Sequence, residues 1–273
     1  MRRVAVIGST GQLGTDVVQV LTAAGAYEVY PLSRGQIECT DLASVRQALT
    51  AVELSVVINC AAFVRVDECD MRPEEAFRVN AIGALVVARA CAGLDALCAY
   101  ISTDYVFDGQ KGEPYTEHDP PGPINAYGTS KLAGEYLVQQ ACPRWLIVRV
   151  ASLFGKAGAW RKGGNFVETI LSKARAGEPL KVVDDIRMSP TYTVDAARAL
   201  EWLIRHGATG LFHLANAGAC SWYEFARKAL DLAHPNARLE RLSTAEYPSQ
   251  ARRPKNSSLQ SSQIRRPENC KRS

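Results

Sequence analysis

A tyrosine and a lysine four positions apart, Tyr127 and Lys131, form a pair with clear chemical potential. On a helix, positions i and i+4 lie on one face about one turn apart, so a phenol and an ammonium can share a site. A phenol with its ordinary pKa near ~10 is a poor proton donor at neutral pH, and a nearby ammonium lowers that pKa. The pair is therefore a candidate general acid, and the alternative is an ordinary contact on a helix surface.

A run of hydroxyl and acidic residues, Ser102-Thr-Asp-Tyr-Val-Phe107, follows a predicted buried strand. Ligands of open α/β sheets gather at the carboxyl ends of the strands. At such an edge the Thr103 hydroxyl can donate to a carbonyl oxygen beside the tyrosine. The alternative is a turn that is merely rich in hydroxyl groups.

Three glycines, Gly8, Gly11 and Gly14, stand between the first predicted strand and the first predicted helix. In this order the first glycine permits a tight turn, the second lets the backbone approach phosphates, and the third lets the helix pack close to the strand. The free amides of the helix start then face an anion. The pattern predicts a dinucleotide site, and the alternative is a plain strand–helix turn.

Alternating strands and helices must position these residues. The alternation predicts an α/β fold with a Rossmann-like, doubly wound parallel sheet. The expected strands are 4–7, 28–32, 55–59, 99–102 and 146–150, and the expected helices are 15–24, 41–51, 74–92 and 126–140, the last capped by Asn125. Later elements follow less regularly: helices 165–176, 194–205 and 222–233, and strands 181–183 and 210–214.

The change in regularity after residue 150 predicts two units. We expect a dinucleotide-binding domain over 1–150, to which segments around 178–215 return, and a smaller C-terminal substrate-binding subdomain over 151–177 and 216–259. The polar stretch 260–273 has too little apolar surface to offset the entropy of ordering, so we expect it to be disordered. The last 25 residues carry a net charge of +6 and the rest of the chain −2. A short basic end of this kind is typical of a solvated terminus, so no nucleic-acid partner is expected.

Apolar runs and cysteines indicate a cytoplasmic protein. No run of residues approaches the ~18 apolar residues that cross a bilayer, and the first apolar stretch ends at Gly8, too early for a secretory core. The eight cysteines contain no Cys-x-x-Cys pair. We therefore expect reduced thiols, no membrane contact and no metal site.

Several motifs together resemble the extended short-chain dehydrogenase/reductase superfamily, and within it the dTDP-4-dehydrorhamnose reductase family. The glycine turn and Tyr-x-x-x-Lys belong to the whole superfamily, whereas Asp104-Tyr-Val-Phe107, Ser189-Pro-Thr191 and Arg253-Pro254 narrow it to this family. The resemblance covers roughly residues 1–260.

The resemblance implies a nicotinamide cofactor site. The glycine turn would hold the pyrophosphate, and Asp41 with Leu42 would flank the adenine. The loop segment 62–64 would line the ribose and nicotinamide side. An arginine after the second strand favours a 2′-phosphate and hence NADPH, with NADH as the other cofactor; the alternative is a solvated loop arginine. The implied cofactor-binding residues are Gly8, Gly11, Gln12, Leu13, Gly14, Ser33, Arg34, Asp41, Leu42, Ala61, Ala62, Phe63, Val64, Tyr127 and Lys131.

The implied reaction is reduction of the C4 ketone of a dTDP-linked 4-keto-6-deoxy sugar to dTDP-L-rhamnose. Tyr127 would protonate the alkoxide, Lys131 would lower the pKa of Tyr127 and hold the ribose, and Thr103 would polarise the ketone. Similar sugar-nucleotide 4,6-dehydratases need an Asp-Glu acid–base pair directly after the threonine. Here Asp104 is followed by Tyr105, so the elimination reaction would lack its base. The implied substrate-binding residues are Thr103, Asp104, Tyr105, Ser152 and Arg253.

Two departures from the family pattern bear on the substrate. Ser152 stands where the family usually has a tryptophan that packs on the sugar nucleotide, so the pocket would accept another 4-keto sugar or be filled by Phe154 or Trp160. The chain past Arg253-Pro254 lacks the usual further helix. Rival interpretations are a sugar-nucleotide epimerase and a catalytically silent, cofactor-binding regulatory subunit, and a homodimer is a possible assembly.

Overall fold

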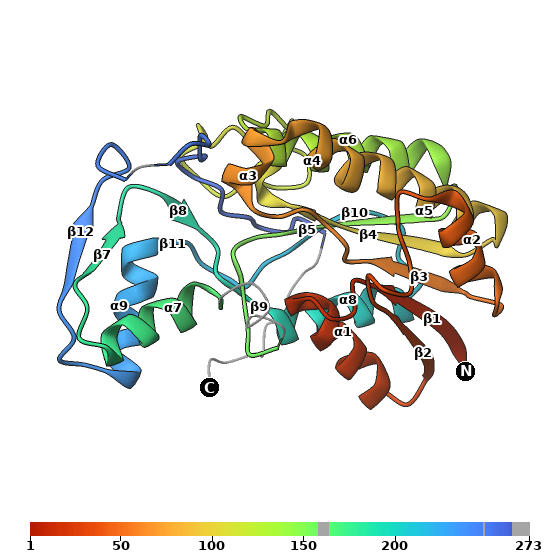
Figure 1. The fold of residues 1–273 in the computed structure, drawn as a ribbon, viewed down its shortest axis with the longest axis horizontal. Helices are drawn as coiled ribbons and strands as arrows, with labels where there is room; N and C mark the ends of the chain where they lie inside the picture. The colour runs from red at the N-terminus through yellow and green to blue at the C-terminus, as the bar shows by residue number, and fades with distance from the viewer. Residues whose placement is uncertain (158–163, 248, 264–273) are drawn as a thin grey trace.

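A six-stranded parallel sheet forms the centre of the molecule in the computed structural model, which describes residues 1–157, 164–247 and 249–263. The strand order is β10-β5-β4-β3-β1-β2, with every pair parallel, as expected for a doubly wound sheet (Figure 1). The strands are β1 (Arg2–Ile7), β2 (Tyr27–Leu32), β3 (Val56–Asn59), β4 (Leu97–Thr103), β5 (Trp145–Val150) and β10 (Gly210–Leu214). The predicted fold class is confirmed.

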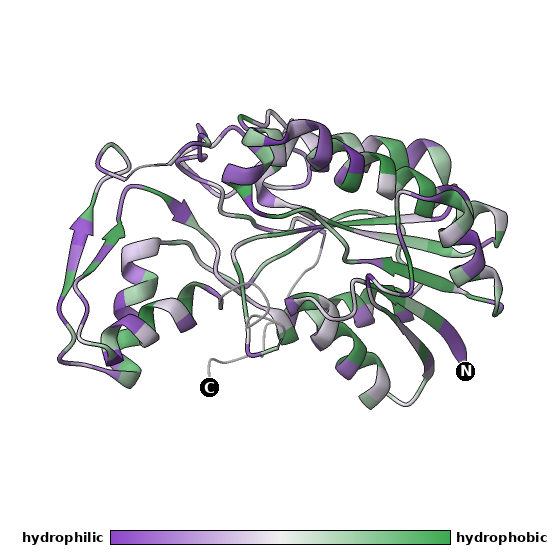
Figure 2. Cartoon of the chain, in the orientation of Figure 1, coloured by the Kyte–Doolittle hydropathy of each residue, from purple (hydrophilic) through white to green (hydrophobic). Residues whose placement is uncertain are grey.

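Helices α1 (Gln12–Ala23) and α8 (Thr193–Arg205) cover one face of this sheet. Their apolar side chains join those of the strands in one core, including Val17, Leu200 and Ile204. The outer faces of these helices are polar (Figure 2). Burial of one apolar stripe per helix therefore fixes how α1 and α8 lie on the sheet.

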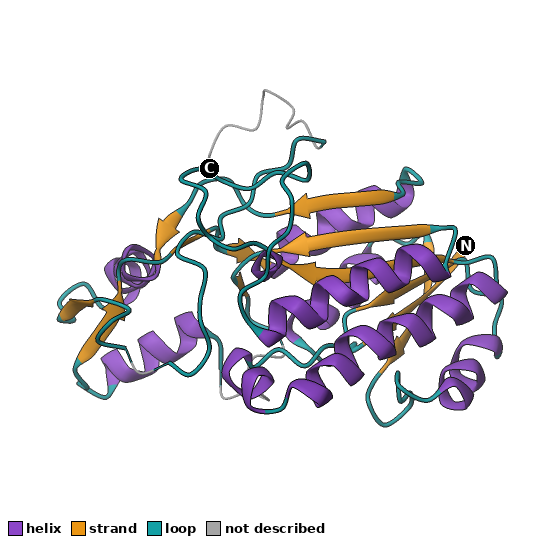
Figure 3. Ribbon diagram, turned by 90° about the horizontal axis from the view of Figure 1, so that it is seen from above, coloured by secondary structure: helices purple, strands orange, loops and turns teal. Residues whose placement is uncertain are grey.

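The other face carries α2 (Leu42–Thr50), α5 (Gly83–Gly93) and α6 (Ala126–Ala141), which share a second core with the strands (Figure 3). Helices α4 (Pro73–Phe77), the π-helical turn η1 (Arg78–Ile82) and α5 follow one another directly, in place of the single helix expected over 74–92. By length and composition Pro73–Gly93 could cross a membrane, but half of the window is buried inside the protein, as in a core helix.

Short elements connect these layers to a smaller lobe. They include α3 (Val66–Met71), the 3-10 turn η2 (Asp104–Val106), and the paired strands β6 (Leu153–Phe154) and β9 (Thr191–Tyr192). The seven cysteines within the described residues are free, as expected for reduced thiols, and Cys270 lies outside them.

The smaller lobe packs two helices on a two-stranded sheet, at the left of Figure 1. Its elements are α7 (Phe166–Arg175), β7 (Leu180–Val183), β8 (Arg187–Met188), β11 (Cys220–Ser221), α9 (Trp222–Ala233) and β12 (Leu239–Leu242). We expected the strand at 181–183 to return to the large sheet, but β7 pairs with β12. The reason is that Leu180 and Val182 bury their side chains against Ala226 and Leu230 of α9. The division into domains otherwise stays a prediction.

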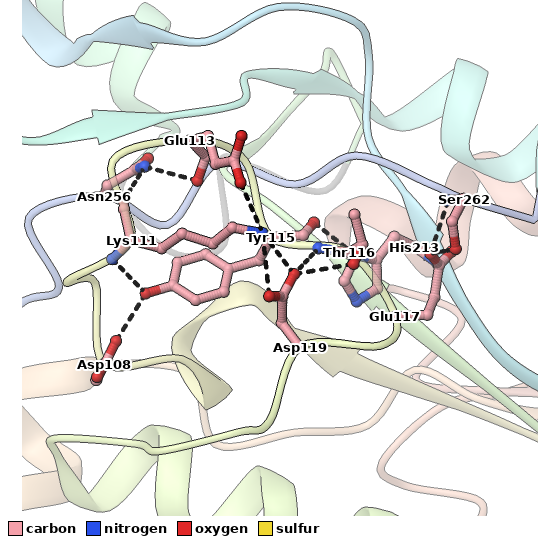
Figure 4. Close-up of polar contacts among 10 residues, drawn as sticks. All are labelled: Asp108, Lys111, Glu113, Tyr115, Thr116, Glu117, Asp119, His213, Asn256 and Ser262. Atoms are coloured by element: carbon pink, nitrogen blue, oxygen red, sulfur yellow. Dashed lines mark hydrogen bonds and ion pairs between the residues drawn. The ribbon is translucent and has the colours of Figure 1, made fainter.

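The expectation of disorder from residue 260 is wrong for residues 260–263. The Gln260 amide donates to Tyr115 O at 2.9 Å, and the Ser262 amide and hydroxyl both donate to Glu117 Oε2 at 2.8 Å (Figure 4). Ser261 Oγ donates to the other oxygen of Glu117 at 2.7 Å. A buried carboxylate needs such donors, and it orders this polar segment. Residues 264–273 lie outside the described residues.

Candidate active site

The glycine turn after β1 forms a cradle at the start of α1. Gly8 has a φ of 74°, which favours glycine, and a Cβ on Gly14 would overlap the Gly8 carbonyl oxygen. Gly11 caps the helix, so the first amides of α1 stay free for an anion. The Gln12 side-chain amide Nε2 is buried here and has no hydrogen-bond partner among the described residues. A diphosphate fits this donor set.

A cavity of about 410 Å³ opens at the carboxyl ends of the large sheet, next to the glycine turn. We call it the strand-end cavity and define it by its walls: the start of α1, the loop after β3, η2, α6 and the β5–β6 turn. The following predicted site residues line it: Gly11, Gln12, Leu13, Gly14, Ala62, Val64, Thr103, Asp104, Tyr105, Tyr127, Lys131 and Ser152. Residues as far apart in the chain as Gly11 and Ser152 thus meet at one site, because parallel strands end at the same edge.

Other predicted cofactor residues lie around this cavity rather than on its lining. Gly8 contacts the loop after β3, since a Cβ there would lie 2.9 Å from Ala61 N. The backbone of Phe63 is held by Asn80, whose side chain accepts from Phe63 N at 2.8 Å and donates to Phe63 O at 3.0 Å. The π-helical turn carries Asn80, and no pattern in the sequence pointed to it.

The residues predicted to contact the adenosine end of the cofactor follow β2 or stand at the start of α2, and they lie at or near the surface. Leu32 O accepts from the Gly8 amide at 2.9 Å, so Ser33 and Arg34 directly follow a residue bonded to the glycine turn. Arg34 is exposed. Asp41 caps α2 by accepting from Ala43 N at 2.9 Å, and the first residue of that helix, Leu42, is exposed. Their roles as cofactor contacts stay predictions.

Thr103, Asp104 and Tyr127 form a hydrogen-bonded group on one wall of the cavity. Asn125 caps α6 by accepting from Gly128 N at 2.8 Å, as predicted, and this places Tyr127 in the first turn. Thr103 Oγ1 donates to Asp104 Oδ1 at 2.9 Å. Burial raises the pKa of Tyr127 above its ordinary value, while its hydrogen bond with Thr103 acts in the opposite direction.

Lys131 lies one turn along α6, and its ammonium contacts the end of β4. Its Nζ donates to Ile101 O at 2.6 Å and lies 3.9 Å from the centre of the Tyr100 ring. Burial lowers the pKa of Lys131 to about 7, against the opposing charge of Glu135. The pKa of Tyr127 is raised rather than lowered, because burial of the phenol is the largest influence on it, and the expected lowering by Lys131 stays a prediction.

A buried ion pair that the sequence analysis missed stands behind Lys131. Arg149 Nε and Nη2 donate to the two oxygens of Glu135 at 2.9 and 2.7 Å, and Ser102 Oγ donates to the same carboxylate at 2.5 Å. A bidentate pair of this kind is strong and geometrically rigid. Glu135 is four residues after Lys131, and this i,i+4 spacing could have suggested that the carboxylate lies near the ammonium, but not that Arg149 pairs with it.

The β5–β6 turn supplies the wall where the family places a tryptophan. Ser152 sits there with a φ of 41°, and Phe154 lines the cavity nearby. Phe154 packs edge-on against Phe225 with ring centres 5.1 Å apart, and Phe166 and Trp222 extend the cluster. Aromatic surface is thus present beside Ser152. Trp160 lies outside the described residues.

A second cavity, of about 880 Å³, lies in the smaller lobe and shares Phe166 and Trp222 with the first. We call it the lobe cavity. Within the described residues its lining includes no carboxylate, and its cationic side chains are Lys173, Lys181, Arg252, Arg253 and Lys255. Such a surface is complementary to a phosphorylated ligand.

Arg253 belongs to the lobe cavity and is held by an acid from α3. Its Nη2 is 2.8 Å from Asp67 Oδ2, and Asp67 Oδ1 accepts from the Ala251 amide at 2.9 Å. Arg253 also hydrogen-bonds the Tyr105 side chain, which lines the strand-end cavity. The guanidinium therefore stands between the two cavities, fixed before any ligand arrives. Among the described residues no cluster of potential metal ligands occurs.

Comparison with known proteins identifies the family. The model for the RmlD substrate binding domain matches residues 1–272. The chain belongs to the RmlD substrate-binding family. A crystal structure of dTDP-4-dehydrorhamnose reductase from Bacillus anthracis in complex with NADP superimposes on this RmlD-family chain with a TM-score of 0.91 at 38% identity, covering 95% of this chain and 91% of that one.

Two curated relatives of this RmlD-family protein carry different substrate names. The dTDP-4-dehydrorhamnose reductase of Sinorhizobium fredii is 34% identical over 97% of this chain and 90% of its own. The dTDP-4-keto-6-deoxy-D-glucose reductase of Streptomyces niveus is 38% identical over 83% of this chain and 77% of its own. Both names describe reductases of dTDP-linked keto sugars.

Proposed function

We propose that this protein is an NADPH-dependent reductase of a dTDP-linked 4-keto-6-deoxy sugar, acting on dTDP-4-dehydro-L-rhamnose to give dTDP-L-rhamnose. The observation that carries the proposal is that the glycine cradle and the Thr103, Tyr127 and Lys131 side chains line one cavity. A cofactor site and a proton donor for a carbonyl thus occur together. The relatives' names supply the substrate class.

The fit of NADPH rests on the chain's own donors. The cradle of Gly8, Gly11 and Gly14 and the free Gln12 amide would hold the diphosphate. Arg34 would meet the 2′-phosphate, and Lys131 would hold the ribose. The bound cofactor supplies the hydride for the ketone.

Tyr127 is the proposed proton donor. Tyr127 is half-buried and lines the cavity together with Thr103, where its hydroxyl can reach an oxygen that gains negative charge as the ketone is reduced. Burial keeps the phenol protonated through neutral pH, so the donor form is present when the substrate arrives. The charge of Lys131 stabilises the phenolate that remains after transfer.

The lobe cavity is the proposed site of the nucleotide diphosphate. It adjoins the strand-end cavity through Phe166 and Trp222, so one ligand can place its sugar near Tyr127 and its phosphates among the cations. Arg253, between the cavities, is the proposed diphosphate contact. Phe154 and its aromatic neighbours would pack on the sugar nucleotide in place of the family's tryptophan.

Purified protein with NADPH and dTDP-4-dehydro-L-rhamnose tests this function. We expect loss of nicotinamide absorbance in proportion to sugar reduced. Altered sugar with unchanged NADPH would favour the epimerase, and tight NADPH binding with no sugar chemistry would favour the silent subunit. A parallel assay with dTDP-4-keto-6-deoxy-D-glucose shows which sugar Ser152 and Phe154 favour.

A further inference from the structure

One buried carboxylate joins three elements beside the strand-end cavity. Glu135 of α6 accepts from Arg149 Nε and Nη2 of β5 at 2.9 and 2.7 Å, and from Ser102 Oγ of β4 at 2.5 Å. Ser102 and Arg149 are also direct partners in the register of β4 and β5. The side chains of Arg149 and Glu135 are only 4% and 1% exposed. We call Ser102, Glu135 and Arg149 the buried clamp.

The buried clamp adjoins the residues that the proposed reaction uses. Thr103 directly follows Ser102 on β4, and Lys131 precedes Glu135 by one turn of α6. Lys131 Nζ donates to Ile101 O at 2.6 Å. Two successive turns of α6 therefore bond two successive residues of β4. A shift of the helix along the strand, or away from it, would break both contacts.

Helix α6 also lies very close to β4 at Gly134, the residue before Glu135. A Cβ on Gly134 would overlap the Tyr100 hydroxyl and the Asn80 carbonyl oxygen. Tyr100 is itself fixed, because its hydroxyl donates to Asn80 O at 2.8 Å. The glycine therefore allows the close approach of helix and strand, and the directional bonds of the buried clamp hold the helix there.

Stability alone does not account for the buried clamp. Burial of two charges costs solvation energy, and replacement of such a pair by apolar side chains of similar volume is often neutral or stabilising. Arg149 also keeps a third nitrogen, Nη1, buried without a hydrogen-bond partner among the described residues. What a bidentate pair does provide is a fixed direction for both of its side chains.

We propose that the three residues of the buried clamp are positioning residues for the ketone reduction. By fixing α6 against β4, they hold Tyr127 and Lys131 in register with Thr103. The clamp itself transfers no proton and no hydride. Its effect on the rate is large because a displacement of about 1 Å between reacting groups can lower a rate ~10²-fold. This inference rests on the proposed function.

Replacement of the whole ion pair separates positioning from stability. Arg149→Met leaves Glu135 charged and unpaired, so we expect both the melting temperature and kcat to fall. The double variant Glu135→Leu with Arg149→Met has no buried charge at either position. We expect its melting temperature to return close to that of the wild type, while kcat stays about tenfold or more below and KM for the sugar nucleotide is unchanged. Recovery of kcat together with the melting temperature overturns the positioning role.

Two milder variants keep the Glu135 charge and therefore test direction rather than charge. Ser102→Ala removes one bond, and Arg149→Lys keeps the cation but cannot form the bidentate pair. We expect both to lower kcat about threefold or more with KM for the sugar nucleotide unchanged. Arg144→Lys, at an exposed arginine just before β5, is the control and should match the wild type. Wild-type kcat in both milder variants overturns the proposal, even where the double variant does not fold.

The assay follows NADPH oxidation with dTDP-4-dehydro-L-rhamnose, alongside thermal unfolding of each variant. The wild type is measured first. A wild type that reduces no keto sugar overturns the proposed function and this inference with it. An active wild type whose rate does not depend on the clamp overturns the positioning role alone.

Discussion

The Tyr127 hydroxyl is the group on which the proposed chemistry depends most. Tyr127→Phe removes one oxygen and leaves the ring that packs edge-on against Tyr105, with centres 5.8 Å apart. We expect kcat to fall by ~10²-fold or more while NADPH affinity stays close to wild type, as for loss of a general acid. Steady-state kinetics with a fluorescence titration of NADPH check this. Turnover above a tenth of wild type would show that another group donates the proton.

Arg34 tests cofactor choice at the same scale. Arg34 is exposed and follows the strand end that is bonded to the glycine turn, so its guanidinium is free to meet a 2′-phosphate. We expect NADPH to be preferred over NADH. Arg34→Ala should raise KM for NADPH alone, by an amount that corresponds to a loss of ~1.5–3 kcal/mol of binding free energy, less where solvent screens the contact. Arg46→Ala, on the neighbouring helix α2, is the control. Equal kinetic constants for both cofactors in the wild type contradict this role.

At the scale of elements, the segment 260–263 is tied to the large sheet through Glu117. Burial alone raises the pKa of Glu117, but donors from Ser261, Ser262 and His213 N outweigh it and bring the pKa to about 2. Ending the chain after Leu259 removes the serine donors. We expect the free energy of unfolding to fall by ~2 kcal/mol or more at pH 7, because hydrogen bonds to a charged group are strong. Ending the chain after Gln263 is the matched control.

The pH dependence of that stability has a defined sign. A carboxyl whose pKa is lower in the folded than in the unfolded state stabilises the fold above the unfolded value, and this contribution is lost as pH falls. The difference in unfolding free energy between the two truncated chains should therefore be present at pH 7 and shrink between about pH 4.5 and 2. Denaturant unfolding at pH 7 and at low pH measures it, and a difference that grows in acid contradicts the assignment.

The elements also show how much the sequence could predict. Strand periodicity and the glycine turn place β1, α1 and the edge where the site forms, because these signals are local. The pairing of β7 with β12, and the contact of Ser262 with Glu117 across 145 residues, depend on which distant surfaces remain to be covered. The bond from Ser257 to Asp104 is of the same kind. No local pattern encodes this contact, so it emerged only from the folded structure.

For the whole molecule, the proposal requires one ligand to span the two adjoining cavities. Arg253, held between them by Asp67, is the residue that tests this. We expect Arg253→Ala to raise KM for the sugar nucleotide about tenfold while KM for NADPH is unchanged, since one charge-assisted contact is lost. Arg238→Ala, at an exposed site of the smaller lobe, is the control. A change confined to NADPH would place the arginine at the cofactor instead.

The measurement that tests the central claim most directly is the stoichiometry of the complete reaction. With NADPH and dTDP-4-dehydro-L-rhamnose in equal amounts, we predict that one NADPH is oxidised, as followed by nicotinamide absorbance, for each molecule of dTDP-L-rhamnose formed. With Tyr127→Phe we predict no measurable oxidation over the same interval. Sugar product formed without loss of NADPH, or NADPH bound without any sugar product, would contradict the assignment of this chain as a keto-sugar reductase.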